Sequence, residues 1–280
     1  SAVFIAIGAH KSIKLDIPGE DADGVISGIE FLRKVNVGIG IDIGKHVAVI
    51  GGGNTAIDAA RTALRLGARK VTILYRRTKF EMPASEEEIE DAEAEGIHIA
   101  YLTAPVEILK DNGKVKALKC IRMTLGEPDS SGRRRPIPVP NSEHILEFDK
   151  VIVAISQTPD LHGLQMNNTF ITTKWGTLQT NLETLETNVK GVFAGGDVVL
   201  GPSTVIASMG QGRRAAESIE KYLNNEPLQN YTTHMVKLEV LRGESFRPHS
   251  YAPTYKETPK IERERVPKLN PSARKNTFEE

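Results

Sequence analysis

The segment 46–77 restricts the possible folds of this chain more than any other part of the sequence. An apolar strand at 47–50 leads into three consecutive glycines at 51–53. A helical pattern follows, in which apolar side chains recur three and four positions apart, and 71–75 has the composition of a second strand. This succession of strand, glycine turn, helix and strand predicts a βαβ unit with parallel strands.

The glycine turn has the spacing of a dinucleotide-binding loop. Gly51, Gly53 and Ala56 occupy the three positions of G-x-G-x-x-G/A. The first permits a tight turn, the second admits a pyrophosphate and the small third residue permits close helix packing. Asn54 and Thr55 open the helix, whose unpaired N–H groups favour a phosphate. A plain α/β turn is the alternative, but the flanking strands favour a dinucleotide site.

The end of the second strand indicates which dinucleotide is bound. An NAD site places Asp or Glu there to hold the ribose 2′-hydroxyl, whereas this chain has Arg76 and Arg77, followed by Lys79. Guanidinium groups pair well with a 2′-phosphate, so we expect NADP(H). The alternative is that these residues are solvated surface cations.

The composition argues against several classes of function. The chain has 280 residues, of which 39% are hydrophobic, and this is enough for two joined domains. Lys plus Arg and Asp plus Glu number 36 each, so no net charge favours nucleic acid or an anionic membrane. No apolar run is long enough to span a membrane. Cys120 is the only cysteine, which excludes an internal disulfide, and we expect a cytoplasmic protein.

Other patterns predict the elements around the βαβ unit. We expect strands at 3–7, 97–101, 151–155 and 191–197, helices at 28–34, 85–96 and 203–223, and a hairpin at 106–123 with its turn at 111–113. The stretch 126–141 is rich in Pro and Arg, shows no periodicity and is predicted to be irregular. The acidic helix at 85–96 favours a solvated face over a metal site, since acidic residues complement a helix N-terminus.

Four separated segments resemble the two-dinucleotide flavoprotein reductases. They are VFIAIGA at 3–9, the glycine unit with YRR at 75–77, VIVAISQTPD at 151–160 and GVFAGGD at 191–197. The runs RRTKFEMPASEEEIEDAEAEGI and CIRMTLGEPDSSGRRRPIPVPNSE are similar to the small (beta) subunit of NADPH-dependent glutamate synthase and to the related large subunits of ferredoxin:NADP oxidoreductases. The resemblance covers about residues 3–225.

The resemblance implies an α/β fold in which a Rossmann-like, three-layer NADP(H)-binding domain is inserted into an FAD-binding domain. We therefore expect FAD-domain segments at 1–42 and 156–230, an NADP(H)-binding domain at 43–155 and an extended tail at 231–280. The chain opens without Met, apparently inside a strand, and is interpreted as an N-terminally incomplete member of the family. The FAD domain is expected to be partial for this reason.

The resemblance also assigns residues to the flavin and the nicotinamide. The carboxylate of Asp197, after Gly196, is expected on the flavin ribityl hydroxyls, although a turn Asp that caps a loop is the alternative. Ser203, Thr204 and Val205 are expected to open a helix whose N-terminus faces the flavin pyrimidine. The nicotinamide region is expected at Ser156 and Gln157, where the family usually has Gly-Gln.

Hydride transfer needs geometry more than acid–base groups, so no side chain is predicted to be catalytic. The expected function is an NADPH-dependent flavoprotein oxidoreductase that passes hydride from NADPH to FAD and electrons to a partner. That partner is a glutamate synthase large subunit or an iron–sulfur or ferredoxin protein. The alternative is a non-catalytic NADP(H)-binding and assembly module of a redox complex. FAD is expected to bind this chain weakly or not at all, because the FAD-binding glycine loop is not among these residues.

Overall fold

The computed structural model describes residues 1–129, 132–164, 169–228 and 268–277. The chain divides into two compact units, each formed by segments that are distant in sequence. One comprises Ser1–His10 and Thr158–Pro267, and the other comprises Lys11–Gln157 and Lys268–Glu280. The second unit contains the βαβ segment and is described first.

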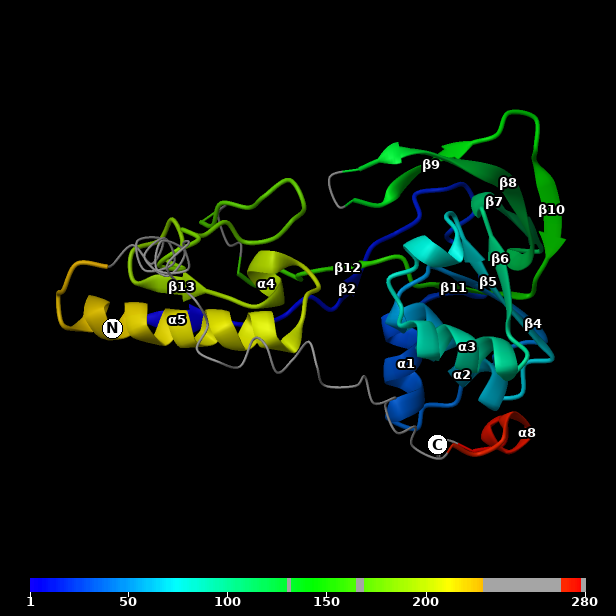
Figure 1. Ribbon diagram of the computed structural model, residues 1–280, viewed down its shortest axis with the longest axis horizontal. Helices are drawn as coiled ribbons and strands as arrows, with labels where there is room; N and C mark the ends of the chain where they lie inside the picture. Colours follow the sequence, from blue (N-terminus) through cyan, green and yellow to red (C-terminus); the bar gives the residue numbers. More distant parts are fainter. Residues whose placement is uncertain (130–131, 165–168, 229–267, 278–280) are drawn as a thin grey trace, which may run out of the picture. The chain divides into compact units, whose positions relative to one another are not determined.

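This larger unit is built on a parallel sheet with the order β3-β11-β4-β5-β6. Its strands are β3 (Val25–Ser27), β11 (Lys150–Val153), β4 (His46–Ile50), β5 (Lys70–Tyr75) and β6 (His98–Tyr101). The helices α1 (Gly28–Asn36), α2 (Asn54–Arg65) and α3 (Glu86–Ala94) lie on one face (Figure 1). Because side chains alternate along a strand, Val47 and Val49 of β4 face the helices whereas Ala48 and Ile50 face the opposite layer.

An antiparallel sheet forms that opposite layer. It contains β7 (Thr103–Asp111), β8 (Lys114–Pro128), β9 (Arg134–Pro138) and β10 (His144–Glu147). Asn112 and Gly113 join β7 to β8 with φ values of 51° and 80°, which is the left-handed geometry of a tight hairpin turn. The predicted hairpin is therefore confirmed. The three layers are helices, parallel sheet and antiparallel sheet (Figure 1).

The stretch 126–141, predicted to be irregular, instead contains part of a second hairpin. Strand β9 pairs with the end of β8, with Met123 opposite Pro138 and Leu125 opposite Pro136. Proline cannot donate a ladder hydrogen bond, so it is confined to edge strands. Strand β9 fits this rule, because among the described residues it pairs with β8 and with no other strand. The prediction was wrong because the prolines obscured the strand pattern.

The boundaries of the units also differ from the expected 42/43 and 155/156. Strand β3 pairs with β11 in parallel, with Val25 opposite Val151, so residues 11–42 complete the sheet of the larger unit. The division falls at His10 and at Gln157. In the tail, 268–277 belongs to the larger unit and forms α8 (Pro271–Arg274), whereas 231–267 and 278–280 lie outside the described residues.

The smaller unit pairs its first strand with a distant one. Strand β1 (Val3–Ile5) runs parallel to β13 (Val192–Ala194). Helix α5 (Val205–Leu223) packs against β13 through Tyr222, whose ring meets Phe193 edge-on at 5.9 Å between centroids. Among the described residues, the remaining short elements of the two units are β2 (Lys11–Ser12), η1 (Lys79–Glu81), β12 (Gln157–Thr158) and α4 (Asp197–Leu200).

A buried carboxylate links the helices of the larger unit. Glu95, at the end of α3, is fully buried and accepts from Arg61 Nη2 at 2.8 Å and from Arg65 Nη1 at 3.0 Å, both on α2. Arg274 of α8 lies 3.6 Å from the same carboxylate and 3.0 Å from Asp91. Burial raises the pKa of Glu95, but hydrogen bonds from Arg61 and Arg65 outweigh it and the net pKa is lowered. The C-terminal segment is therefore held on α2 and α3 by charge.

We predict that Glu95→Ala destabilises the larger unit by about 3–5 kcal/mol, because two buried guanidiniums lose their carboxylate. A lowered pKa means that this contribution is complete above the unfolded-state pKa of Glu95 and is lost as the pH falls through the folded-state value. Urea unfolding at neutral and acidic pH measures both effects. Glu90→Gln, at an exposed position of α3, is the matched control. Equal stability of the two variants would contradict the role of Glu95.

Candidate functional site

The order of the parallel sheet defines where a ligand can bind. From β4 the chain proceeds to β5 and β6 on one side, whereas β11 and β3 lie on the other. The loops that leave β4 and β11 therefore diverge at the carboxyl edge of the sheet. In open α/β sheets, ligands bind in the crevice at such a switch point. The residues there are 51–56 after β4 and 154–157 after β11.

Gly51 lies at the narrowest point of this edge. Its φ is 146°, and a Cβ at this position would lie 2.1 Å from the carbonyl oxygen of Ala154 and 3.3 Å from Cβ of Ala56. A side chain at residue 51 would therefore collide with the backbone that follows β11. The small side chain of Ala56, fully buried, permits α2 to start this close to the sheet.

Gly53 lies in open space, in contrast to the crowded Gly51. It is the N-cap of α2, no side chain caps the helix there, and a Cβ at Gly53 would meet no atom within 4 Å. Open space therefore lies beside the start of α2, which is formed by Asn54 and Thr55. Gln157 donates from Nε2 to Oγ1 of Thr55 at 3.2 Å. The structure therefore brings Gln157 to the first turn of α2, as expected for two strands that flank a switch point.

Two neighbours of this site were not singled out from the sequence. A Cβ at Gly28, the first residue of α1, would lie 3.2 Å from Thr55 Cγ2 and 3.1 Å from Ala154 Cβ. A Cβ at Gly52 would lie 2.5 Å from the ring of Tyr75. Gly28 opens the helix predicted at 28–34, but its position beside Thr55 and Ala154 depends on the pairing of β3 with β11, which no local pattern indicates. Ser156 is exposed beside Gln157, and its carbonyl accepts from Ile13 N.

The three cations expected at the end of β5 differ in their surroundings. Arg76 is exposed, whereas Arg77 is 6% exposed. Arg77 donates from Nε to the carbonyl of Arg134 at 2.7 Å and from Nη2 to Oδ2 of Asp129 at 3.1 Å. Lys79 lies 3.5 Å from Glu93 of α3. Among the described residues, Arg77 and Lys79 each form an ion pair with a carboxylate, whereas Arg76 is exposed and forms none.

The residues expected at the flavin form one continuous turn in the smaller unit. Gly196, with φ of 76°, donates its N–H to Gln211 at 2.6 Å. Asp197 accepts from the N–H of Ser203 at 3.2 Å through Oδ1, so it does cap the loop between α4 and α5. Thr204 is the N-cap of α5 and Val205 its first residue, so the helix expected from Ser203 begins two residues later.

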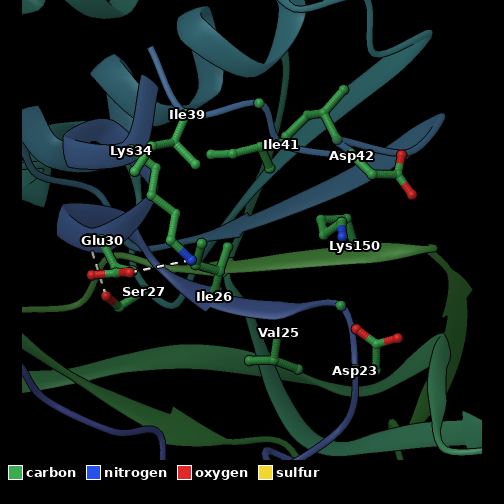
Figure 2. A pocket seen from close by; sticks show the side chains of 13 residues that line it. Asp23, Val25, Ile26, Ser27, Glu30, Lys34, Ile39, Ile41, Asp42 and Lys150 are labelled. Carbon is green, nitrogen blue, oxygen red and sulfur yellow. Dashed lines mark hydrogen bonds and ion pairs between the residues drawn. The ribbon is translucent and has the colours of Figure 1, made fainter. Parts of the chain in front are cut away.

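A hollow of about 490 Å³ lies elsewhere on the larger unit (Figure 2). It is lined by β3, by Glu30 and Lys34 of α1, by the segment 39–43 and by Lys150, the first residue of β11. An ion pair of 3.2 Å joins Lys34 to Glu30 at its side (Figure 2). The hollow extends along β3 from Asp23 to Ser27 and contains none of the predicted site residues.

The described residues offer no other evident reactive centre. No group of three or more His, Cys, Asp or Glu side chains in them could hold a metal ion. Cys120 is fully buried, and burial raises its pKa to about 12, so it is an inert core residue. Within the same residues, no helix combines the length and apolar character that crossing a membrane requires.

The two glycines give opposite expectations for substitution. Gly53→Val should leave the melting temperature nearly unchanged but abolish nucleotide binding, because its side chain enters the open space above α2. Gly51→Val should instead lower the melting temperature sharply, because its Cβ collides with the Ala154 carbonyl. Thermal unfolding and calorimetric titration with NADPH separate the two cases. A Gly53→Val variant that binds NADPH normally would place the nucleotide elsewhere.

Comparisons with solved structures identify the fold. FprA from Mycobacterium tuberculosis, solved in complex with NADPH, matches with a TM-score of 0.67 and 19% identity over 86% of this chain and 69% of FprA. Thioredoxin reductase from T. acidophilum matches with a TM-score of 0.58 and 23% identity over 80% of this chain and 66% of the reductase. These likenesses confirm the expected α/β, two-dinucleotide flavoprotein fold.

Comparisons of sequence identify the family. The beta subunit of NADP(+)-dependent formate dehydrogenase from Moorella thermoacetica is 49% identical over 225 residues, 79% of this chain and 32% of the relative. The beta subunit of NADPH-Fe(3+) oxidoreductase from Geobacter sulfurreducens is 44% identical over 79% of this chain and 37% of the relative. The glutamate synthase [NADPH] small chain of Azospirillum brasilense is 37% identical over 79% of this chain and 48% of the relative.

These relatives confirm the resemblance to glutamate synthase small subunits. The chain spans about a third of the length of the first two. A family model described as pyridine nucleotide-disulphide oxidoreductase matches residues 1–212, most of the chain. The chain therefore belongs to the pyridine nucleotide-disulphide oxidoreductase family.

Proposed function

We propose that this chain is the NADPH-oxidising part of a flavoprotein oxidoreductase that passes hydride to FAD and electrons to a partner protein. The observation that supports this most is the open backbone at Gly53 beside Gln157, at the switch point of the sheet. The names of the relatives agree, since formate dehydrogenase, Fe(3+) oxidoreductase and glutamate synthase relatives are all described as NADP- or NADPH-dependent.

The pyrophosphate of NADP(H) would bind at the start of α2. The N–H groups of the first turn and the partial positive charge of a 12-residue helix favour an anion there. Gly53 leaves room for this anion, and Asn54 and Thr55 provide the backbone that faces it. Ser156 and Gln157 follow β11 on the other side of the crevice, where the nicotinamide would lie. Gln157 is held there by its hydrogen bond to Thr55.

The preference for NADP(H) over NAD(H) would come from the end of β5. Arg76 and Arg77 follow this strand, and no Asp or Glu stands there to accept from a ribose 2′-hydroxyl. Arg76 is exposed and can form charge-assisted hydrogen bonds with a phosphate. Lys79 and Arg77 add positive charge nearby, although each has an acidic neighbour.

The flavin would be bound by the smaller unit. Bound FAD supplies the two-electron acceptor that the protein itself lacks. Asp197 uses Oδ1 to accept from Ser203, and its Oδ2 is the atom proposed to accept from the ribityl hydroxyls. Gly196 has a left-handed backbone and lets the chain turn there without a side chain. The N-terminus of α5, at Thr204 and Val205, would stabilise negative charge on the reduced ring.

A partner protein would take the electrons. The relatives are named as subunits or chains of larger enzymes, which supports a synthase large subunit or an iron–sulfur or ferredoxin partner. The equal numbers of acidic and basic residues leave no net charge that would favour a nucleic acid or an anionic membrane as a partner. The proposed setting is the cytoplasm.

Calorimetric titration of the full chain tests the nucleotide part of the proposal. We expect NADPH to bind more tightly than NADH, and Arg76→Ala with Arg77→Ala together to weaken NADPH by about 2–4 kcal/mol while NADH changes little. Equal losses for the two nucleotides would show that these residues do not recognise the phosphate.

Anaerobic spectroscopy tests the redox part. With FAD supplied at high concentration, NADPH should bleach the oxidised flavin absorbance, and Asp197→Ala should slow this reaction. A chain that binds NADPH but never reduces flavin under these conditions would contradict the oxidoreductase proposal and favour the assembly module.

A further inference from the structure

The hairpin formed by β8 and β9 is fastened to the end of β5 by one buried side chain. Arg77 is the second residue after β5 and reaches the hairpin with two donors, Nε to the Arg134 carbonyl at 2.7 Å and Nη2 to Asp129 at 3.1 Å. The Arg77 side chain is 7% exposed, and Asp129 balances its charge. These contacts fix residues on both sides of the hairpin tip against the edge of the sheet where the nucleotide is proposed to bind.

Arg133 is held between these fixed points. Its carbonyl accepts from the N–H of Asp129 at 2.8 Å, and the next residue, Arg134, accepts from Arg77. Arg133 is exposed, as is Arg76. Partial desolvation and the charge of Arg77 lower the pKa of Arg76, and the charge of Arg133 lowers it further. The carbonyl that Arg77 holds belongs to the residue next to Arg133, so Arg133 follows the hairpin to the end of β5, where its positive charge acts on Arg76.

Two exposed cations that repel each other beside a nucleotide crevice are stabilised by a shared dianion. Arg77 is less suited to that role, because it is buried and its donors already serve Asp129 and a carbonyl. We propose, on the basis of the NADP(H) function proposed above, that Arg76 and Arg133 together bind the 2′-phosphate and that Arg77 is a positioning residue. Arg77 holds the hairpin so that Arg133 reaches the site.

Calorimetric titration of the full chain with NADP+ and NAD+ tests the role of Arg133. We expect Arg133→Ala to weaken NADP+ binding by about tenfold or more, from the loss of charge-assisted hydrogen bonds, with NAD+ binding nearly unchanged. Arg133→Lys should retain part of the preference because the charge remains. The matched control is Arg135→Ala, in the same basic triplet and also exposed, which should behave as the wild type.

A double-mutant cycle tests the role of Arg77. If Arg77 acts through Arg133, Arg77→Ala should lower the NADP+ preference in the wild type but add little in the Arg133→Ala background. Arg77→Lys should fail to rescue, because one ammonium cannot hold both Asp129 and the Arg134 carbonyl with the geometry of a guanidinium. Fully additive losses, or rescue by Arg77→Lys, would show that Arg77 contacts the phosphate itself.

The two proposals fail in different ways. A wild-type chain that binds NAD+ as tightly as NADP+ would overturn the proposed nucleotide preference. A wild-type chain that prefers NADP+, with an Arg133→Ala variant that keeps the whole preference, would overturn only the assignment of Arg133. Far-UV circular dichroism of each variant shows whether the hairpin substitutions preserve the fold.

Discussion

The close approach of two backbone segments at Gly51 determines the geometry of the candidate site. The N–H of Gly51 donates to Leu74 of β5, and the N–H of Ala154 donates to Ile50 of β4. Three strands therefore end together around one residue that has no room for a side chain. This contact directs the chain into α2 at Gly53, where there is space above the helix N-terminus. The crowding at Gly51 and the open space at Gly53 are therefore two consequences of the same backbone contact.

Charged residues have two distinct roles in the larger unit. Buried Glu95 pairs with Arg61 and Arg65, and buried Arg77 pairs with the partly buried Asp129, and both groups join segments distant in sequence. A buried charge is retained only when it is paired, so these groups stabilise the packing of helices and hairpin. Arg76 and Arg133 remain exposed. Arg77 therefore has a structural role, and recognition of the nucleotide is proposed for Arg76 and Arg133.

The sequence predicted those features that depend on local patterns. The βαβ unit, the Asn112-Gly113 turn and the helix expected at 203–223 follow from periodicity and from residues with particular backbone preferences. It did not predict the pairing of Arg77 with Asp129, because the two residues are 52 positions apart and no local pattern links them. The placement of residues 11–42 in the larger unit was missed for the same reason, since it depends on the pairing of β3 with β11.

Amide chemical shifts measured during an NADPH titration test the central claim most directly. If the nucleotide binds at the switch point, the largest shift changes in the ¹⁵N-labelled chain should occur at Gly51, Gly53, Thr55 and Gln157. The hollow lined by β3 and 39–43 serves as an internal reference, because it contains none of the predicted site residues. Changes concentrated at Val25, Ile41 and Lys150, with the glycine loop unaffected, would contradict the account.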